Sequence, residues 1–248
     1  KQICAIADAV MIDRGDLSAE IGIENLFQAI IKIAHETKMA GIPLIMATEN
    51  LSSMLINQQP SKSDVISLSH SIQIGTDAIM LSDETAMSVQ YEPILDWLST
   101  FLSKKSNQYL YAYKQAGATV TEDLMWSSIS SLPKGLPFIL ISRSGAAFKK
   151  LVGSGFENLH LITDNQKLFE LASLYNLKIT RKLFPKLTTK QPSELIYDYV
   201  EDNFDEIFSE HDCALATFVS TPFHGATADN ITFITKQDLI KKLSDASK

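Results

Sequence analysis

Hydroxyl and acidic side chains follow three short apolar runs in the first half of the chain, at Asp13–Asp16, Thr48–Asn50 and Ser82–Thr85. Asp16 offers a hard oxygen ligand to Mg²⁺. Gly15 permits a tight turn in which backbone amides approach a ligand closely. The hydroxyls of Thr48 and Ser82 can donate a hydrogen bond, or pass a proton, to a bound anion. These residue types predict an anion site that could also hold a divalent metal.

The apolar runs before these residues are expected to be strands, at Ala9–Ile12, Pro43–Ala47 and Asp77–Ser82. Helices are expected between and after them, over Glu24–Ala40, over Pro60–Ile74 and from Pro93 onward. Nearly continuous apolar strands joined by long crossovers are typical of a parallel sheet buried on both faces. Because ligands gather at the carboxyl ends of such strands, the polar residues should converge on one site.

Each of these residues also has a purely structural interpretation. Asp16 could cap the turn or helix that follows the first strand. Thr48 could be an ordinary turn hydroxyl, and Ser82 taken alone carries little information. Their predicted convergence on one edge of the sheet favours a functional site.

The second half predicts a separate α/β domain, with the boundary after residue 114 and domains over 1–114 and 115–248. The expected strands are Phe138–Ser142, Leu159–Thr163, Leu177–Leu183, Cys213–Ser220 and Ile231–Thr235, with a clear helix over Ser193–Phe208. We therefore expect an open, mostly parallel sheet of about five strands.

A second candidate anion site follows the first strand of that domain. Ser142, Ser144 and Gly145 lie where a strand ends and a helix begins, and Lys149 and Lys150 add positive charge nearby. Free amides at a helix start can bind a phosphate. The alternative is that Ser144 only caps the helix.

Composition excludes several classes of protein. The 248 residues are 45% hydrophobic and 21% charged, with a net charge of −7, which argues against a nucleic-acid-binding face. No apolar run approaches the roughly 20 residues of a membrane span. Cys4 and Cys213 match no metal or redox spacing and are expected to be free thiols in a reducing, cytoplasmic compartment. The chain does not begin with Met and looks cut from something longer.

Four segments in series resemble the pyruvate kinase family. "VMIDRGDLSAEI", "GIPLIMATENLSSML", "QPSKSDV" and "GTDAIMLSDETA" follow the order and spacing of family motifs over Ala9–Ala86. "FILISRSGAA" and "HLITDNQKLFELASLYNLKIT" continue the resemblance into the second half. The resemblance implies strands six to eight of a (β/α)₈ barrel, followed by the family's C-terminal α/β domain. The family's lid domain and earlier barrel strands would be absent.

The resemblance also implies a role for each strand-end residue. The amides of Gly15 and Asp16 would hold the carboxylate of phosphoenolpyruvate, Asp16 would ligate Mg²⁺ or Mn²⁺, and Arg14 would brace this turn. Thr48 would contact substrate, and Ser82 and Glu84 would lie near the path that delivers a proton.

The implied reaction is phosphoryl transfer from phosphoenolpyruvate to ADP, giving pyruvate and ATP in glycolysis. The resemblance also implies K⁺, whose ligands would lie upstream of Lys1, and a homo-oligomer, a tetramer in the family. The family's catalytic lysine and second metal carboxylate also lie upstream, so this fragment alone should be inactive. Loop Ser142–Lys150 matches a loop that binds sugar-phosphate effectors in many members.

Several residues depart from the family pattern. The departures are Asp13 for Ala, Ser18 for Gly, Glu49 for Gln, Asn50 for Met, Ser52 for Glu, Lys62 for Arg and Asp83 for Gly. They leave two functions open: part of a pyruvate kinase, or a diverged, non-catalytic module that binds a phosphorylated metabolite or serves in assembly.

Overall fold

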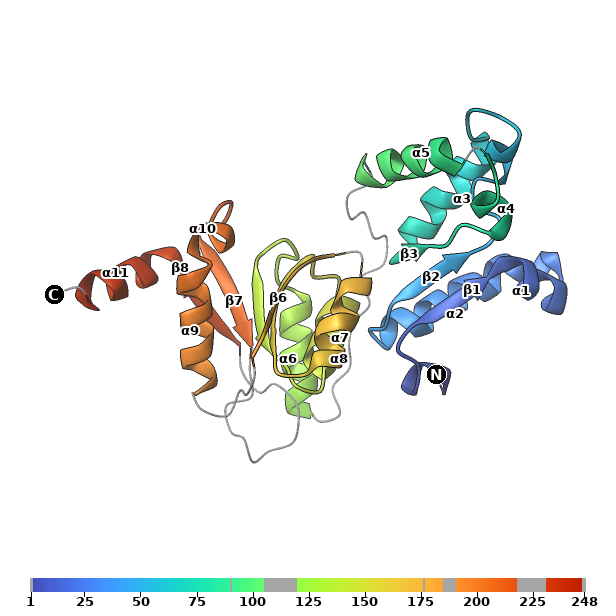
Figure 1. The fold of residues 1–248 in the computed structure, drawn as a ribbon. Helices are drawn as coiled ribbons and strands as arrows, with labels where there is room; N and C mark the ends of the chain where they lie inside the picture. Colours follow the sequence, from blue (N-terminus) through green and yellow to red (C-terminus); the bar gives the residue numbers. More distant parts are fainter. Residues whose placement is uncertain are drawn as a thin grey trace. The chain divides into compact units, whose positions relative to one another are not determined.

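The computed structural model describes residues 2–89, 91–104, 120–175, 177–184, 191–217 and 231–246. The chain divides into two compact units: Lys1–Tyr113 with Leu174–Asn176, and Lys114–Ser173 with Leu177–Lys248. The division falls within residues 105–119, outside the described part. Each unit is built on its own sheet (Figure 1).

The first unit contains a parallel sheet in the order β1-β2-β3. Its elements are η1 (Ile3–Ala5), β1 (Val10–Asp13), α1 (Arg14–Ile21), η2 (Ile23–Asn25), α2 (Leu26–Met39), β2 (Leu44–Ala47), η3 (Ser52–Leu55), α3 (Lys62–Gln73), β3 (Ala78–Ile79), α4 (Asp83–Ala86) and α5 (Tyr91–Lys104). Apolar side chains of the strands and α2, including Ile12, Ile30 and Met46, form one buried cluster. The parallel α/β arrangement predicted for this half is confirmed.

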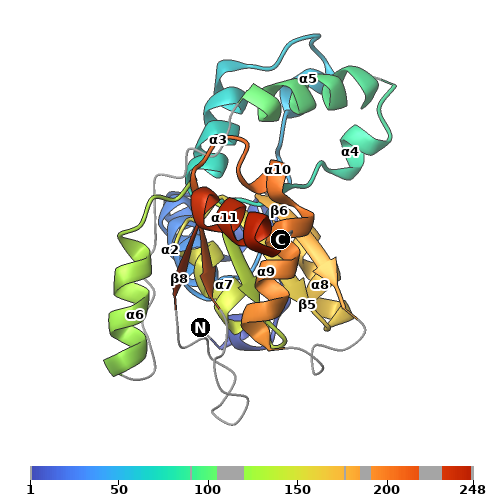
Figure 2. The ribbon, with the colours of Figure 1, turned by 90° about the vertical axis from the view of Figure 1, so that its left-hand side faces the viewer.

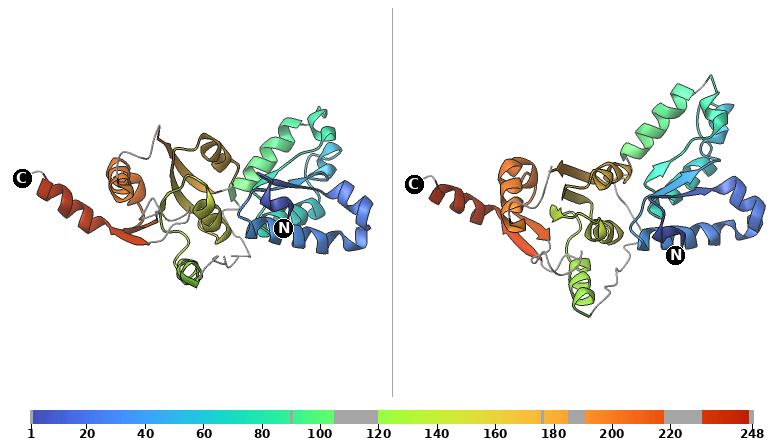
Figure 3. Two further views of the ribbon diagram at one scale, coloured as in Figure 1. Left: turned by 90° about the horizontal axis from the view of Figure 1, so that it is seen from below. Right: turned by 60° about the horizontal axis from the view of Figure 1, so that its bottom comes forward.

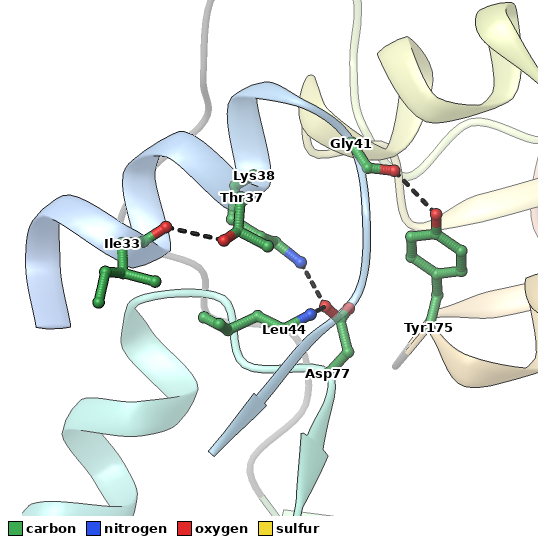
Figure 4. A network of polar contacts seen from close by, with 7 residues as sticks. All are labelled: Ile33, Thr37, Lys38, Gly41, Leu44, Asp77 and Tyr175. Carbon is green, nitrogen blue, oxygen red and sulfur yellow. Dashed lines mark hydrogen bonds and ion pairs between the residues drawn. The ribbon is translucent and has the colours of Figure 1, made fainter. Parts of the chain in front are cut away.

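A buried ion pair lies at the end of this sheet where β2 and β3 begin. Lys38 Nζ lies 2.6 Å from Asp77 Oδ2, and the two side chains are 7% and 1% exposed. The same carboxylate oxygen accepts a hydrogen bond from the Leu44 amide at 2.8 Å, as Figure 4 shows. Removal of either charge would leave the other buried without this ion-pair partner, which is energetically costly. The ion pair and the Leu44 hydrogen bond therefore link α2 to the starts of β2 and β3.

The second unit contains a five-stranded sheet in the order β6-β5-β4-β7-β8, parallel except for β8 against β7. Its elements are α6 (Val120–Ser130), β4 (Phe138–Ile141), α7 (Ala146–Gly153), β5 (Asn158–Thr163), α8 (Gln166–Leu171), η4 (Ala172–Leu174), β6 (Lys178–Leu183), α9 (Pro192–Asp202), α10 (Phe204–Ile207), β7 (Cys213–Thr217), β8 (Thr232–Thr235) and α11 (Lys236–Ala246). The prediction of a mostly parallel sheet of about five strands is confirmed.

Helices cover both faces of this second sheet. Figures 1 and 2 show α9 and α7 on opposite faces, and Figure 3 follows β8 into α11. Ile196, Tyr199 and Val200 of α9 join one buried cluster with Ile139 of β4 and other strand residues. Burial on both faces explains why β4 and β5 are nearly continuous apolar runs.

Three expected elements differ in extent. The expected helix Ser193–Phe208 is two helices, α9 and α10, because Asn203 leaves helical geometry and its side-chain amide donates to the Tyr199 carbonyl. The third strand pairs only over Ala78–Ile79. The strand expected over Cys213–Ser220 is described only to Thr217, since residues 218–220 lie outside the described part.

Two further features bear on the sequence predictions: the state of the cysteines and the length of the helices. Cys4 and Cys213 are both free. Within the described ranges, no helix combines the length and apolar character needed to cross a bilayer.

Candidate anion site at the strand ends

The carboxyl ends of β1 and β2 lie side by side in the first unit. Asp13, the last residue of β1, is in register with Ala47, the last residue of β2. The next residues, Arg14 and Thr48, are therefore neighbours although they lie 34 positions apart in the chain. The parallel register thus brings two of the sequence-predicted site segments together.

Helix α1 begins directly after β1, and its first amides point at oxygen atoms of Asp13 and Thr48. Thr48 Oγ1 accepts from the amides of Arg14 at 3.1 Å and Gly15 at 3.3 Å. Asp13 Oδ1 accepts from the Asp16 amide at 3.0 Å and from the Thr48 hydroxyl at 3.1 Å. The N-cap of α1 is thus Asp13, and the structural alternative that Asp16 caps the helix is wrong.

Gly15 lies in the first turn of α1 rather than in the tight loop that its residue type suggests. A Cβ atom at Gly15 would lie 3.4 Å from Asp13 Oδ1 and 3.9 Å from Thr48 Oγ1. The missing side chain therefore keeps the backbone open on the side where these two oxygens approach.

The Arg14 side chain is buried and joins both strand ends. Its Nε donates to the Ala47 carbonyl at 3.4 Å and its Nη1 to Ser67 Oγ at 2.6 Å. Its Nη2 donates to the Thr48 carbonyl and, at 2.9 Å, to Asn50 Oδ1. The planar guanidinium can reach four acceptors at once, which a lysine could not do.

Charge around Arg14 is balanced by nearby acids. Burial lowers the pKa of the Arg14 guanidinium from its ordinary value, and the carboxylates of Glu49, Asp13 and Asp64 act in the opposite direction. An arginine keeps its charge under such conditions because its ordinary pKa is so high. The strand ends therefore hold one buried cation among three acids.

The loop after β2 has an unusual backbone. Thr48, Glu49 and Leu51 have φ values of 58°, 52° and 58°, in the left-handed region that non-glycine residues seldom adopt. Asn50, 2% exposed, sits among them and donates to the carbonyls of Met46 at 3.3 Å and Met80 at 2.9 Å. Together with its bond to Arg14, the Asn50 side chain connects the ends of all three strands.

Two residues of this network have no site role in the sequence analysis. Ser67 comes from α3, where nothing in the sequence marks it. Asn50 is recognised only as a departure from the family pattern, and the usable signal is a polar residue where methionine is usual.

The remaining predicted residues are less closely connected. Asp16 is exposed in the first turn of α1. Ser82 precedes α4, and its carbonyl accepts from the amides of Thr85 at 3.0 Å and Ala86 at 3.1 Å. Among the described residues, the Ser82 hydroxyl makes no hydrogen bond to Thr48 or Arg14. The side chain of Glu84 lies outside the described part of the structure.

A metal would find few ligands at this site. In the part of the chain that the structure describes, no three histidine, cysteine or acidic side chains are grouped closely enough to hold an ion. Asp16 offers one exposed carboxylate at this edge of the sheet.

The second predicted anion loop joins β4 to α7 in the second unit. Ser142 Oγ accepts from the Gly145 amide at 3.0 Å, and Ser144 Oγ accepts from the Ala146 amide at 3.3 Å. Gly145 has a φ of 82°, and a Cβ there would lie 3.0 Å from Leu168 Cδ1. The loop hydroxyls thus receive the amide of the N-cap residue Gly145 and the first amide of α7.

Comparisons with known proteins agree with this architecture. Residues 1–93 match the family described as "Pyruvate kinase, barrel domain". A pyruvate kinase of Encephalitozoon cuniculi is 34% identical over 118 residues, which are 48% of this chain and 28% of that protein. Pyruvate kinase 1 of Candida glabrata is 29% identical over 213 residues, covering 81% of this chain and 41% of the relative.

A solved structure extends the likeness over both units. The crystal structure of a pyruvate kinase from Cryptosporidium parvum matches 94% of this chain and 48% of its own, with a TM-score of 0.71 and 20% identity. The chain spans less than half the length of each of these three proteins.

Proposed function

Because the chain is related to the pyruvate kinases, we propose that it supplies the last barrel strands and the C-terminal domain of an enzyme that transfers the phosphoryl group of phosphoenolpyruvate to ADP. The observation that carries this proposal is the junction of Arg14, Thr48 and the α1 amides at the strand ends, within the segment that matches the barrel domain. Catalysis of such a transfer depends mainly on positioning and on stabilising charge.

Each residue has a stated part in this proposal. Arg14 holds the loop after β2 against the start of α1, and Thr48 with the amides of Gly15 and Asp16 would bind the substrate carboxylate. Asp16 would supply one oxygen to Mg²⁺, the ion that, with K⁺, pyruvate kinases generally use. Ser82 and Glu84 would serve proton delivery to the enol carbon. A cytoplasmic homo-tetramer belongs to the same proposal.

An assay of ATP formation tests the proposal. A longer protein that contains these 248 residues and the upstream lysine should make ATP that depends on phosphoenolpyruvate, ADP and Mg²⁺. The 248-residue chain alone should make no more ATP than a heat-inactivated sample. A longer protein without any such activity would contradict the proposed enzyme.

The second candidate is a non-catalytic module that binds a phosphorylated metabolite. One observation favours it: the carboxylate of Asp13 already accepts from the Asp16 amide and the Thr48 hydroxyl, two of the donors that would hold substrate. In this case the effector-type loop of Ser142, Ser144 and Gly145 would be the remaining ligand site. Calorimetric titration with a sugar phosphate at low salt, with Ser144→Ala as control, distinguishes this role from a simple helix cap.

A further inference from the structure

The start of α1 is already occupied by oxygen atoms of the chain itself. Its first three amides donate to just two of them: Arg14 and Gly15 to Thr48 Oγ1, and Asp16 to Asp13 Oδ1. A helix start with unengaged amides attracts an anion through its N–H groups and its dipole. Here the acidic side chain of Asp13 receives the third amide, and the hydroxyl of Thr48 receives the first two.

The hydrogen bonds to Asp13 exceed those of an ordinary N-cap. A capping side chain satisfies one amide of its own helix. Asp13 Oδ1 also receives the hydroxyl proton of Thr48 at 3.1 Å, from the loop after the neighbouring strand. One carboxylate oxygen thus collects donors from two separate elements, which is how a bound carboxylate would be held.

We propose that Asp13 determines the specificity of this site, because its carboxylate occupies the position of a substrate carboxylate and must be displaced before such a ligand binds. The inference rests on the proposed function, since it concerns the same amides and the same hydroxyl. The native chain should therefore bind carboxylate ligands, phosphoenolpyruvate included, more weakly than a chain without the Asp13 carboxylate.

Local space and charge support this displacement. Asp13 Oδ1 lies 3.4 Å from where a Gly15 Cβ would be, so it covers the side of the backbone that the glycine leaves open. Arg14 is a nearby cation, and its charge already interacts with Asp13, Glu49 and Asp64. A ligand carboxylate beside Asp13 would add a further negative charge without a new cation to offset it.

The sequence pattern agrees from a separate direction. The segment that resembles the family motif carries Asp at position 13 where alanine is usual, and alanine has no oxygen with which to occupy the amides. The departure therefore lies at one of the two side chains, Asp13 and Thr48, whose oxygens receive the first amides of α1.

The experiment is calorimetric titration of the 248-residue chain with phosphoenolpyruvate, and with inorganic phosphate as an anion that lacks a carboxylate. Asp13→Ala and Asp13→Gly should bind phosphoenolpyruvate about tenfold tighter than the parent chain, or more, while affinity for phosphate changes little. Asp13→Asn should gain only part of this affinity, because it loses the negative charge while its Oδ1 keeps the two hydrogen bonds. Glycine is well tolerated at an N-cap, so Asp13→Gly decides the matter if Asp13→Ala fails to fold.

Each other result overturns the inference in a distinguishable way. If the parent binds phosphoenolpyruvate as tightly as the glycine variant, Asp13 does not block the site, and the proposed function is unaffected. If Asp13→Asn gains as much as Asp13→Ala, loss of charge explains the gain, and occupation of the site is wrong. If no folded variant binds phosphoenolpyruvate more tightly than the parent chain does, the inference is wrong, whereas the proposed function is judged separately by ATP formation in the longer protein.

Discussion

Two strand-to-helix turns of this protein, β1 to α1 and β4 to α7, provide hydrogen-bond acceptors for amides at the start of the helix with different groups. Each has an arginine just after the strand. The Arg14 side chain is buried and donates to four acceptors. The Arg143 side chain is 63% exposed and pairs with Asp164 at 2.8 Å.

The capping groups differ as well. A carboxylate and a hydroxyl from two elements receive the first amides of α1. Before α7, two local serines receive the amides of the N-cap Gly145 and of Ala146. A hydroxyl can rotate and donate to an incoming anion, but an ionised carboxylate can only accept. The Ser142 and Ser144 hydroxyls can therefore turn to donate to another group, whereas Asp13 Oδ1 remains an acceptor for Asp16 and Thr48.

Removal of the Arg14 side chain should have the largest effect on the unfolding free energy. It tests whether the turn from β1 to α1 depends on this arginine. Arg14→Ala would leave several buried acceptors without a donor, so we expect a loss of about 3 kcal/mol or more in the unfolding free energy of the first unit. Arg143→Ala removes an exposed ion pair and should change the second unit by less than about 0.5 kcal/mol.

Urea unfolding followed by tryptophan fluorescence measures both changes. Trp97 lies in the first unit and Trp126 in the second, so Trp126→Phe and Trp97→Phe backgrounds report one unit each. Equal losses for the two arginine variants would remove the contrast between the turns.

Acid should destabilise the second unit through His160. This side chain is fully buried, with Nδ1 3.0 Å from the Tyr199 hydroxyl, and burial lowers its pKa from 6.5 to about 4. Between these values the unfolded chain binds a proton that the folded chain does not. Stability is therefore lost as the pH falls from 6.5 to 4, by about 3 kcal/mol at most.

The dependence of the unfolding free energy on pH, followed through Trp126, checks this expectation. His160→Leu has no ring to titrate and should flatten the profile over that range. An unchanged slope in this variant would assign the acid sensitivity to other groups. In the first unit, burial also lowers the pKa of His70, but this ring is only partly buried and its effect should be smaller.

Asn50 should contribute an intermediate amount to the first turn. Asn50→Ala removes one acceptor for Arg14 and donors to two buried carbonyls, so we expect a loss of about 2 kcal/mol. Asn57→Ala is the matched control, since Asn57 is exposed and donates only to the Ser53 carbonyl. Urea unfolding reported by Trp97 measures both, and a loss no larger than that of Asn57→Ala would show that Asn50 is dispensable.

The serines of the second turn should have the smallest effects. Ser142→Ala leaves the Gly145 amide without its acceptor and should cost about 1 kcal/mol, because Ser142 is buried. Ser144→Ala, at an exposed hydroxyl, should lower the unfolding free energy by only a few tenths of a kcal/mol. Fluorescence of Trp126 during urea unfolding provides the measurement, and a larger loss for Ser144 would reverse the assigned order.

Much of this fold is accessible from sequence because several of its strands, such as β2, β4 and β7, are almost completely buried. The runs at Val10–Asp13, Leu44–Ala47 and Phe138–Ile141 are apolar over almost every residue, and turn residues bound them. The short third strand is harder to delimit, since Ala78–Ile79 pairs with β2 alone and its apolar run continues beyond the pairing.

The candidate site is less predictable, because its contacts join residues that are distant in sequence. Residue type and spacing select Thr48 and Asp16, but not Ser67, which reaches Arg14 across 53 positions. Helix α1 is also missed: its sequence has few apolar residues and includes a glycine, and its start depends on Asp13 and Thr48 from two strand ends.

Turnover of an Asp16→Ala variant tests the proposed enzyme most directly. It is measured in a longer protein that contains this chain and forms ATP from phosphoenolpyruvate and ADP, at saturating Mg²⁺. If Asp16 supplies an oxygen to Mg²⁺, its loss should lower turnover by roughly a hundredfold or more, while Asp96→Ala, at an exposed position of α5, should leave turnover unchanged. A variant of Asp16 that keeps near-parental turnover would contradict the assignment of the strand-end site.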